Sequence, residues 1–115
     1  MTNLYLGDIA VRDGRFDIAL PYLEAAQKVL PGMSQVHLLL GRCFQGQGEF
    51  QKAKTEFVAA IQADPTAAQP HYLLAQVYRR LNDATASASE IAKYEQLSKA
   101  EANKTQIRNE IGSEK

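Results

Sequence analysis

The chain has 115 residues and a mass of 12.7 kDa, which is enough for one domain with a buried core. Its residues are 45% hydrophobic and 23% charged, values that are ordinary for a folded protein and argue against wholesale disorder. Basic and acidic residues number 13 each, so no net field attracts nucleic acid or an anionic membrane surface.

Taken in chain order, the apolar residues recur at steps of three and four, which predicts helices, and no alternating run predicts a strand. Pro31 and Pro65 each end a helix, because proline lacks the amide that continues the hydrogen-bond ladder. Gly14, Gly48 and Asn82 end others, since these residue types accept a positive φ. The predicted helices lie near residues 2–13, 17–30, 34–47, 51–63, 68–81 and 84 to about 110.

Three residues near predicted helix starts need a separate interpretation. Asp17 is placed to cap the N-terminus of the second helix. Pro21 and Pro70 each lie about one turn into a helix, where most amides lack partners. We therefore expect a small distortion at each proline and no break.

The chain also repeats itself at an offset of 34 residues. At many positions small residues fall on small ones and large residues on large ones. The matches include Leu6-Gly7 with Leu40-Gly41 and Leu74-Ala75, Phe16 with Phe50, Ala19 with Ala53, Leu23 with Phe57, Ala26 with Ala60, Pro31 with Pro65, and His37 with His71. Six helices in three such periods predict three helical pairs.

The pattern His37-x-x-Leu40-Gly41-x-x-Phe44, followed by Ala53-x-x-x-Phe57, Ala60 and Pro65, resembles a tetratricopeptide repeat at its full length. The resemblance covers about residues 2–98. It implies an all-α fold, a right-handed α-solenoid of three antiparallel helix pairs with an extended C-terminal helix. The repeats would span about 1–32, 33–66 and 67–98, and residues 99–115 would form a polar helical extension that frays at its end.

The two ends of the array depart from the family pattern. Tyr94 stands where the family prefers a small residue, so we expect it to obstruct docking of a further repeat. No proline stands at the end of the third repeat, so the last helix runs on toward Ile107 and Ile111, which share one face. The first repeat begins without a capping segment, which suggests a domain cut from a longer protein or an apolar edge covered by another subunit.

No residues suggest catalysis, a cofactor or a metal site, so we predict that the protein is not an enzyme. His37 and His71 lie one repeat apart, too far for both imidazoles to reach one metal ion, and read as packed side chains. Cys43 has no histidine or basic neighbour in its own helix turn except Arg42, and reads as a small core residue.

The resemblance implies that the first helix of each pair lines a concave groove in which ligands lie. By position, the groove would present Leu4, Asp8, Arg12, Gln35, Leu38, Arg42, Gln45, Gln69, Tyr72, Gln76, Arg79 and Arg80. Arginine binds carboxylates through two parallel hydrogen bonds, and Leu38 and Tyr72 would add apolar contact. The alternative is that these are ordinary solvated side chains on a helix surface.

Two functions follow. The first is a non-catalytic module that binds a peptide or partner protein in the arginine-lined groove, with an acidic or C-terminal carboxylate as the recognised group. The second is a structural spacer or self-association domain that stacks through its uncapped first repeat as a monomer or weak homodimer. Neither involves nucleic acid, and no apolar run or signal peptide predicts membrane insertion. A lone cysteine favours the cytoplasm over the periplasm, and both stay open.

Overall fold

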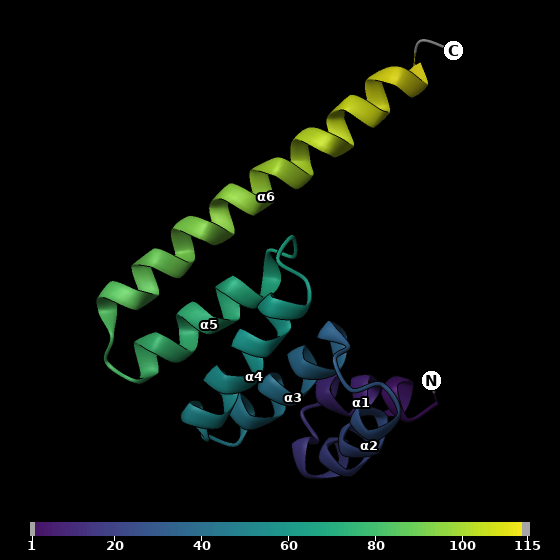
Figure 1. The fold of residues 1–115 in the computed structure, drawn as a ribbon, viewed down its shortest axis with the longest axis vertical. Coiled ribbons are helices and arrows are strands. Elements are labelled where there is room, and N and C mark those ends of the chain that lie inside the picture. The colour runs from purple at the N-terminus through teal and green to yellow at the C-terminus, as the bar shows by residue number, and fades with distance from the viewer. Residues whose placement is uncertain (1, 114–115) are drawn as a thin grey trace.

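The computed structural model describes residues 2–113, with side chains for residues 2–106, and every regular element in these residues is a helix. Figure 1 shows six helices joined by short turns. Their bounds are α1 Thr2–Arg12, α2 Phe16–Val29, α3 Ser34–Gly46, α4 Phe50–Ala63, α5 Gln69–Arg80 and α6 Ala84–Ser113. The all-α prediction is confirmed, and the first five helices begin and end within a residue of the expected positions.

The turns use the residues that the sequence marks for positive φ. Gly14 and Gly48 have φ values of +74° and +79°, and Asn82 has +61°. Each follows the first helix of a pair and lets the chain reverse direction at once, because glycine and asparagine tolerate left-handed backbone. These three residues therefore produce the antiparallel pairs.

The prediction that Asp17 caps α2 is wrong. Arg15 occupies the cap position without a side-chain hydrogen bond, and Asp17 is the second residue of the helix. Its carboxylate there still favours the positive end of the helix dipole. The side chain that caps is Asp83, whose Oδ1 accepts a hydrogen bond of 3.1 Å from the Ala86 amide. Helix α2 continues through Pro21, as expected.

The helices form three antiparallel pairs, α1/α2, α3/α4 and α5/α6, stacked in chain order as an α-solenoid (Figure 1). Across the described residues, each pair touches only its neighbour in the stack. The radius of gyration is 15.8 Å, above the roughly 13 Å of a spherical domain of this length. The elongated shape follows from stacking in one direction and from the length of α6, which extends beyond the stacked pairs (Figure 1).

Two apolar clusters hold the pairs together. The first lies between α1/α2 and α3/α4 and includes Leu23, Leu39 and Cys43, all fully buried. The second lies between α3/α4 and α5/α6 and is centred on Phe57, with Leu74 and Val77 beside it. Each cluster draws residues from two pairs, so no pair could bury its apolar face alone.

Glycines mark the points where two helices of a pair come closest. A Cβ atom added at Gly41 would lie 2.5 Å from the Phe57 ring, and one at Gly7 would lie 2.6 Å from Leu23 Cδ2. Both distances are shorter than van der Waals contact permits, so the absence of a side chain is what allows these approaches.

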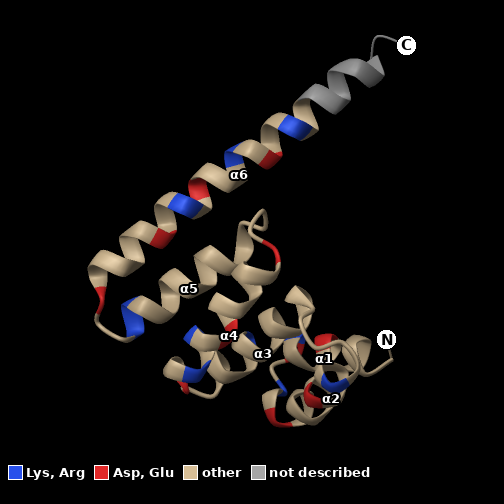
Figure 2. Cartoon of the chain, in the orientation of Figure 1, with Lys and Arg blue, Asp and Glu red and all other residues tan. Residues whose placement is uncertain are grey.

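The last pair contains two contacts that the earlier pairs lack. Tyr94 on α6 packs its ring against Tyr72 on α5, with centroids 5.2 Å apart. Ser87, at the position of Ala19 and Ala53, fits the narrow space and donates a buried hydrogen bond of 2.9 Å to the Ala75 carbonyl. Beyond this contact region, residues 99–106 of α6 are all exposed, and charges of both signs alternate along them (Figure 2). The predicted shared face of Ile107 and Ile111 lies outside the described side chains.

Candidate peptide-binding groove

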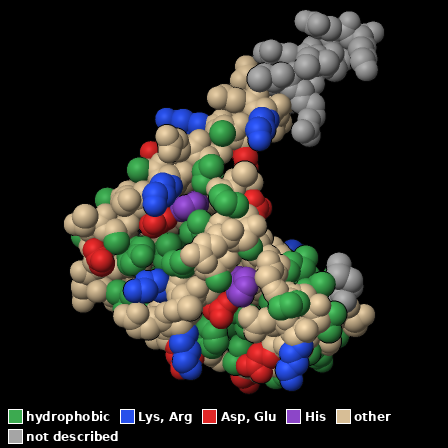
Figure 3. Space-filling view, viewed as in Figure 1, with side chains coloured by type: hydrophobic (Ala, Val, Ile, Leu, Met, Phe, Trp, Pro, Cys, Tyr) green, Lys and Arg blue, Asp and Glu red, His purple; other side chains and the backbone are tan. Residues whose placement is uncertain are grey.

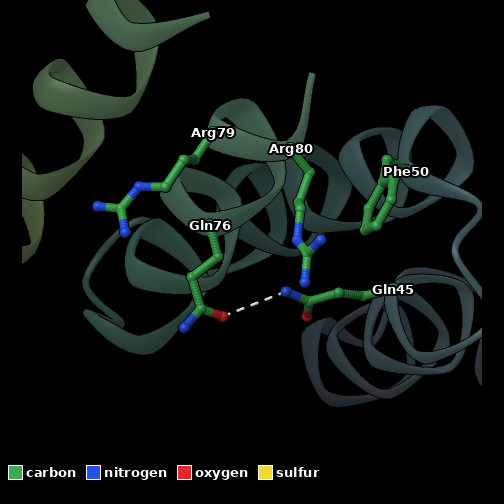
Figure 4. Close-up of a pocket in the computed structure, with 5 residues that line it drawn as sticks. All are labelled: Gln45, Phe50, Gln76, Arg79 and Arg80. Carbon is green, nitrogen blue, oxygen red and sulfur yellow. Dashed lines mark hydrogen bonds between the residues drawn. The ribbon is translucent and has the colours of Figure 1, made fainter. Parts of the chain in front are cut away.

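The first helices of the second and third pairs bring a central group of the predicted groove residues together. Gln45 on α3 and Gln76 on α5 are joined side chain to side chain, with Gln45 Nε2 donating to Gln76 Oε1 at 3.1 Å (Figure 4). Two hollows open on either side of this amide pair, and both are lined by Gln45 and Gln76. We call the surface formed by both hollows the central groove.

One hollow of the central groove is cationic. It has a volume of about 310 Å³ and is lined by Gln45, Phe50, Gln76, Arg79 and Arg80. Figure 4 shows Arg80 reaching toward Gln45, while Arg79 points away from the amide pair. The Arg80 guanidinium carbon lies 5.8 Å from the centre of the Phe50 ring, close enough for a cation–π interaction that holds the side chain in place.

The other hollow is more apolar, with a volume of about 300 Å³. The aliphatic and aromatic part of its lining consists of Val11, Phe16 and Leu73, and Arg42 stands at its border. Gly46 makes this hollow possible, because a Cβ atom there would lie only 2.2 Å from the Phe16 ring. The missing side chain at Gly46 therefore lets the Phe16 ring lie close to the backbone of α3.

Three arginines of the central groove have no counter-charge. Among the side chains described, which are those of residues 2–106, none of Arg42, Arg79 and Arg80 forms an ion pair. Arg12 differs, because its guanidinium lies 3.1 Å from Asp8 one helical turn away. Of the four arginines predicted to line the groove, three therefore lack an ion-pair partner among the described side chains.

The remaining predicted residues lie away from the centre. Leu4, Asp8 and Gln35 share a smaller hollow of about 210 Å³ with Tyr5, at the other end of α1. Gln69 and Tyr72 lie near the start of α5, and Tyr72 is 42% exposed beside Tyr94. The structure does not bring these two sets into the central groove.

The burial of Leu38 contradicts the prediction that this residue lines the groove. Its side chain is only 8% exposed and packs in the second apolar cluster with Phe57 and Leu74. Leu38 lies on the same helix as Arg42, one turn earlier. Its side chain is buried because α5 of the next pair packs over it. Leu38 therefore supplies core packing and no contact surface for a ligand.

Both histidines pair with a glutamate 19 residues later. His37 Nδ1 lies 2.7 Å from Glu56 Oε2, and His71 Nδ1 lies 2.6 Å from Glu90 Oε2. Figure 3 shows each histidine beside an acidic side chain. Each histidine–glutamate pair joins the first helix of a repeat to the second. The histidines are packed side chains, as expected, and each also has a polar partner. No group of three or more metal-ligating residues occurs in the described part of the chain.

Cys43 is fully buried in the first cluster. Burial raises the pKa of its thiol to about 11, and the positive charge of Arg42 opposes that rise without cancelling it. A thiol with such a pKa is protonated near neutral pH, so it is a core residue and no nucleophile.

Five groove residues were missed from the sequence, namely Val11, Phe16, Gly46, Phe50 and Leu73. A signal existed for two of them, since Phe16 and Phe50 recur at the offset of 34 just after each turn glycine. Glu56 and Glu90 recur at the same offset as the histidines that they contact. In both cases the repeat identified equivalent positions without saying which side chains meet there.

Residues 10–77 match the family model of the tetratricopeptide repeat. No curated protein matches the sequence. Within residues 2–113, no helix combines the length and the apolar character that a membrane span requires.

Solved structures share the fold. MamA residues 41 to the end from Desulfovibrio magneticus RS-1 superimpose with a TM-score of 0.82 at 24% identity, covering 87% of this chain and 56% of that one. PcrH, solved in complex with the chaperone binding region of PopB, superimposes with a TM-score of 0.81 at 20% identity, covering 86% and 80%. The chain thus spans a little over half the length of the MamA chain. At these identities the likeness concerns the fold.

Proposed function

This chain belongs to the tetratricopeptide repeat family, and we propose that it is a non-catalytic interaction module that binds a peptide or a segment of a partner protein in its central groove. The repeats of residues 1–98 form the binding unit in this proposal, and residues 99–115 form a terminal extension. The recognised features are one or more carboxylates and an apolar side chain.

The observation that carries the proposal is the set of uncompensated arginines beside an apolar hollow. Arg42, Arg79 and Arg80 lack ion-pair partners among the described side chains, whereas Arg12 has one in Asp8. Arg80 is already ordered against Phe50, so less side-chain entropy is lost when it binds a carboxylate. The apolar hollow at Phe16 and Leu73 lies across the amide pair and suits a hydrophobic side chain of the same ligand.

The amide pair between the hollows favours an extended peptide. The hydrogen bond between Gln45 and Gln76 uses one donor and one acceptor. Gln45 Oε1 and Gln76 Nε2 keep an acceptor and a donor, the two groups that a peptide backbone complements. The complex of PcrH with the chaperone binding region of PopB supports a segment of a partner protein as the ligand class for this fold.

The test is selection of random dodecapeptides displayed on phage against the immobilised protein, followed by affinity measurements on the enriched peptides. We expect enriched peptides to combine an apolar residue with acidic residues or a free C-terminus. Their affinity should fall several-fold between about 50 and 300 mM salt, because exposed ion pairs are screened over about 8–10 Å.

Matched variants locate the binding surface. Arg79→Ala combined with Arg80→Ala should weaken binding about 10-fold or more, since charge-assisted hydrogen bonds contribute about 1.5–3 kcal/mol. Arg15→Ala is the control, because this arginine lies in the turn between α1 and α2 and lines none of the three hollows. Unchanged affinity of every selected peptide for the double variant contradicts the groove assignment, and so does a selection that enriches no peptide.

A further inference from the structure

The hydrogen-bonded amides of Gln45 and Gln76 stand between the two hollows of the central groove. Both side chains are half-buried, and both line each hollow. Their bond of 3.1 Å crosses from α3 to α5, so it joins two helix pairs (Figure 4). We call this amide pair the divider, because a ligand that uses both hollows has to pass over it.

The two hollows differ in the chemical group that they accept. The hollow with Arg79 and Arg80 suits a carboxylate, because it presents two guanidinium groups and no acidic side chain among the described residues lines it. The hollow with Phe16 and Leu73 suits an apolar side chain. Their volumes are about 310 and 300 Å³. A cavity of about 150 Å³ holds a benzene molecule, so each hollow has room for one large side chain.

The thickness of the divider sets the distance between the two recognised groups. Carbon atoms in contact lie about 3.5–4.0 Å apart, so two ligand atoms that touch opposite sides of the divider lie about 7–8 Å from each other. In an extended peptide, residues i and i+2 point to the same face and lie about 6.4–6.8 Å apart. In a helical peptide, residues i, i+3 and i+4 share a face, and their Cβ atoms lie only about 5–6 Å apart. The divider therefore fits an extended ligand with one residue between the two recognised side chains.

The polar atoms of the divider also favour an extended ligand. The bond between the two amides leaves Gln45 Oε1 as an acceptor and Gln76 Nε2 as a donor. The backbone of an extended segment has N–H and C=O groups to offer to both. The backbone groups within a helical segment are already bonded to each other, so a helix would leave the divider unused.

We propose that the central groove recognises an extended segment in which one residue separates an apolar residue from an acidic one, and that Gln45 and Gln76 set this spacing. The inference rests on the proposed function, since it specifies the ligand of the same groove. The apolar side chain enters the hollow at Phe16 and Leu73, and the carboxylate meets Arg80. The side chain between them points away from the protein, because successive side chains of a strand alternate, so its identity is free.

The test uses four phage libraries of dodecapeptides, each with one leucine and one glutamate, in both orders. The two residues are separated by zero, one, two or three positions, and all other positions are drawn from Gly, Ala, Ser, Thr, Asn and Gln. Fusion to the coat protein leaves no free C-terminal carboxylate. We expect the library with one intervening residue to be recovered at least about 10-fold better than the others, because only this spacing fills both hollows at once.

Gln45→Ala combined with Gln76→Ala tests the divider. Removal of both amides joins the two hollows, so the preference for one intervening residue should shrink to less than about 3-fold while Arg79 and Arg80 still bind acidic peptides. A purely structural role of the amides would weaken all four libraries alike and leave their ratio unchanged. Gln69→Ala is the matched control, because this exposed glutamine of α5 lines neither hollow and should keep the preference. Circular dichroism verifies that each variant is folded.

The outcomes separate this inference from the proposed function. Equal recovery of the four libraries overturns the inference, and so does best recovery of two or three intervening residues, the spacing of a helical ligand. Groove binding still stands in that case if Arg79→Ala with Arg80→Ala abolishes recovery. Recovery of no library contradicts both proposals. A double glutamine variant that keeps the full preference shows that the divider does not set the spacing.

Discussion

The first and the last helix pair share one repeat pattern, yet they end the array in opposite ways. The first pair leaves Tyr5, Leu6 and Ile9 exposed on α1. The last pair closes its end with the contact of Tyr94 on Tyr72, and α6 continues as a polar helix whose residues 99–106 are exposed. The difference teaches that burial at a repeat position is set by the neighbouring pair and not by the position itself.

The middle pair shows what a neighbour on each side contributes. Phe57 on α4 is fully buried, and its ring fills the space that Gly41 leaves open in the same pair. Both apolar clusters draw residues from α3/α4. The stability of the two ends therefore depends on the pair between them, and the predictions below test that dependence at each pair in turn.

The largest effect is expected at the centre. Phe57→Ala should lower the free energy of unfolding by about 3–5 kcal/mol, because it leaves a cavity in the second apolar cluster and no neighbouring side chain can fill that cavity. A domain of this size has about 5–15 kcal/mol in total, so the whole array should become marginal. Urea denaturation followed by circular dichroism measures the change, with the exposed Lys52→Ala as a control. A variant that unfolds in two separate steps would show that the ends do not depend on the centre.

The two histidine–glutamate pairs allow a comparison between the middle and the last repeat. Glu90→Ala should cost about 2–3 kcal/mol and Glu56→Ala about 1–2 kcal/mol, since an unpaired polar group is more costly where burial is deeper. The side chains of His71 and Glu90 are 7% and 11% exposed, against 17% and 19% for His37 and Glu56. Chemical denaturation of both variants decides the order, and equal costs would contradict it.

A smaller change should open the closed end. Tyr94→Ala removes the ring contact with Tyr72, at a cost of about 1 kcal/mol, and restores the small residue found at Ala26 and Ala60. With this obstruction gone, the exposed side chains of Tyr5, Leu6 and Ile9 in one copy can stack on the last pair of another. We expect the mass by light scattering to rise with concentration above that of the unaltered chain. If Tyr94→Ala assembles no further than the unaltered chain, Tyr94 is not what closes that end.

The smallest effect is expected for alkylation of the buried Cys43, which should not react in the native protein. Cys43 in α3 and Ile9 in α1 occupy equivalent positions, one covered and one exposed. Iodoacetamide at pH 8 should leave Cys43 unmodified in the native protein, because burial raises its pKa to about 11. In Ile9→Cys the new thiol should react readily, because the side chain at this position is exposed. Mass spectrometry of the alkylated protein distinguishes the two sites.

The same pKa has a consequence for stability. The folded value of about 11 lies above the ordinary value of 9.0, so the neutral thiol is favoured in the fold. Its contribution is complete below pH 9 and is lost as the pH rises through about 11, because only the unfolded chain ionises readily in that window.

Much of the fold could be predicted because its determinants are local. Gly14, Gly48 and Asn82 decide their own backbone shape, and Pro31 and Pro65 end helices by their own chemistry. The offset of 34 residues then identified the pairs. Asp17 was misjudged because a cap depends on which residue begins the helix, and α2 begins at Phe16, one residue before the predicted start.

The groove was predicted less well because it depends on how the pairs are set against each other. Arg42, Gln45, Gln76 and Arg80 come together as the resemblance implies, whereas Leu38 is covered by the next pair. The periodicity of one helix cannot show that difference. The partners of the histidines were missed for the same reason, since a contact between two helices requires their distance and rotation.

The stacking of the pairs has a mechanical consequence. Within the described residues the first pair has no contact with the last, so a pulling force applied at α1 and at the end of α6 crosses both inter-pair interfaces in series. Neither interface shields the other from the load, and the weaker one opens first. The molecule would then lengthen in steps, one helix pair at a time.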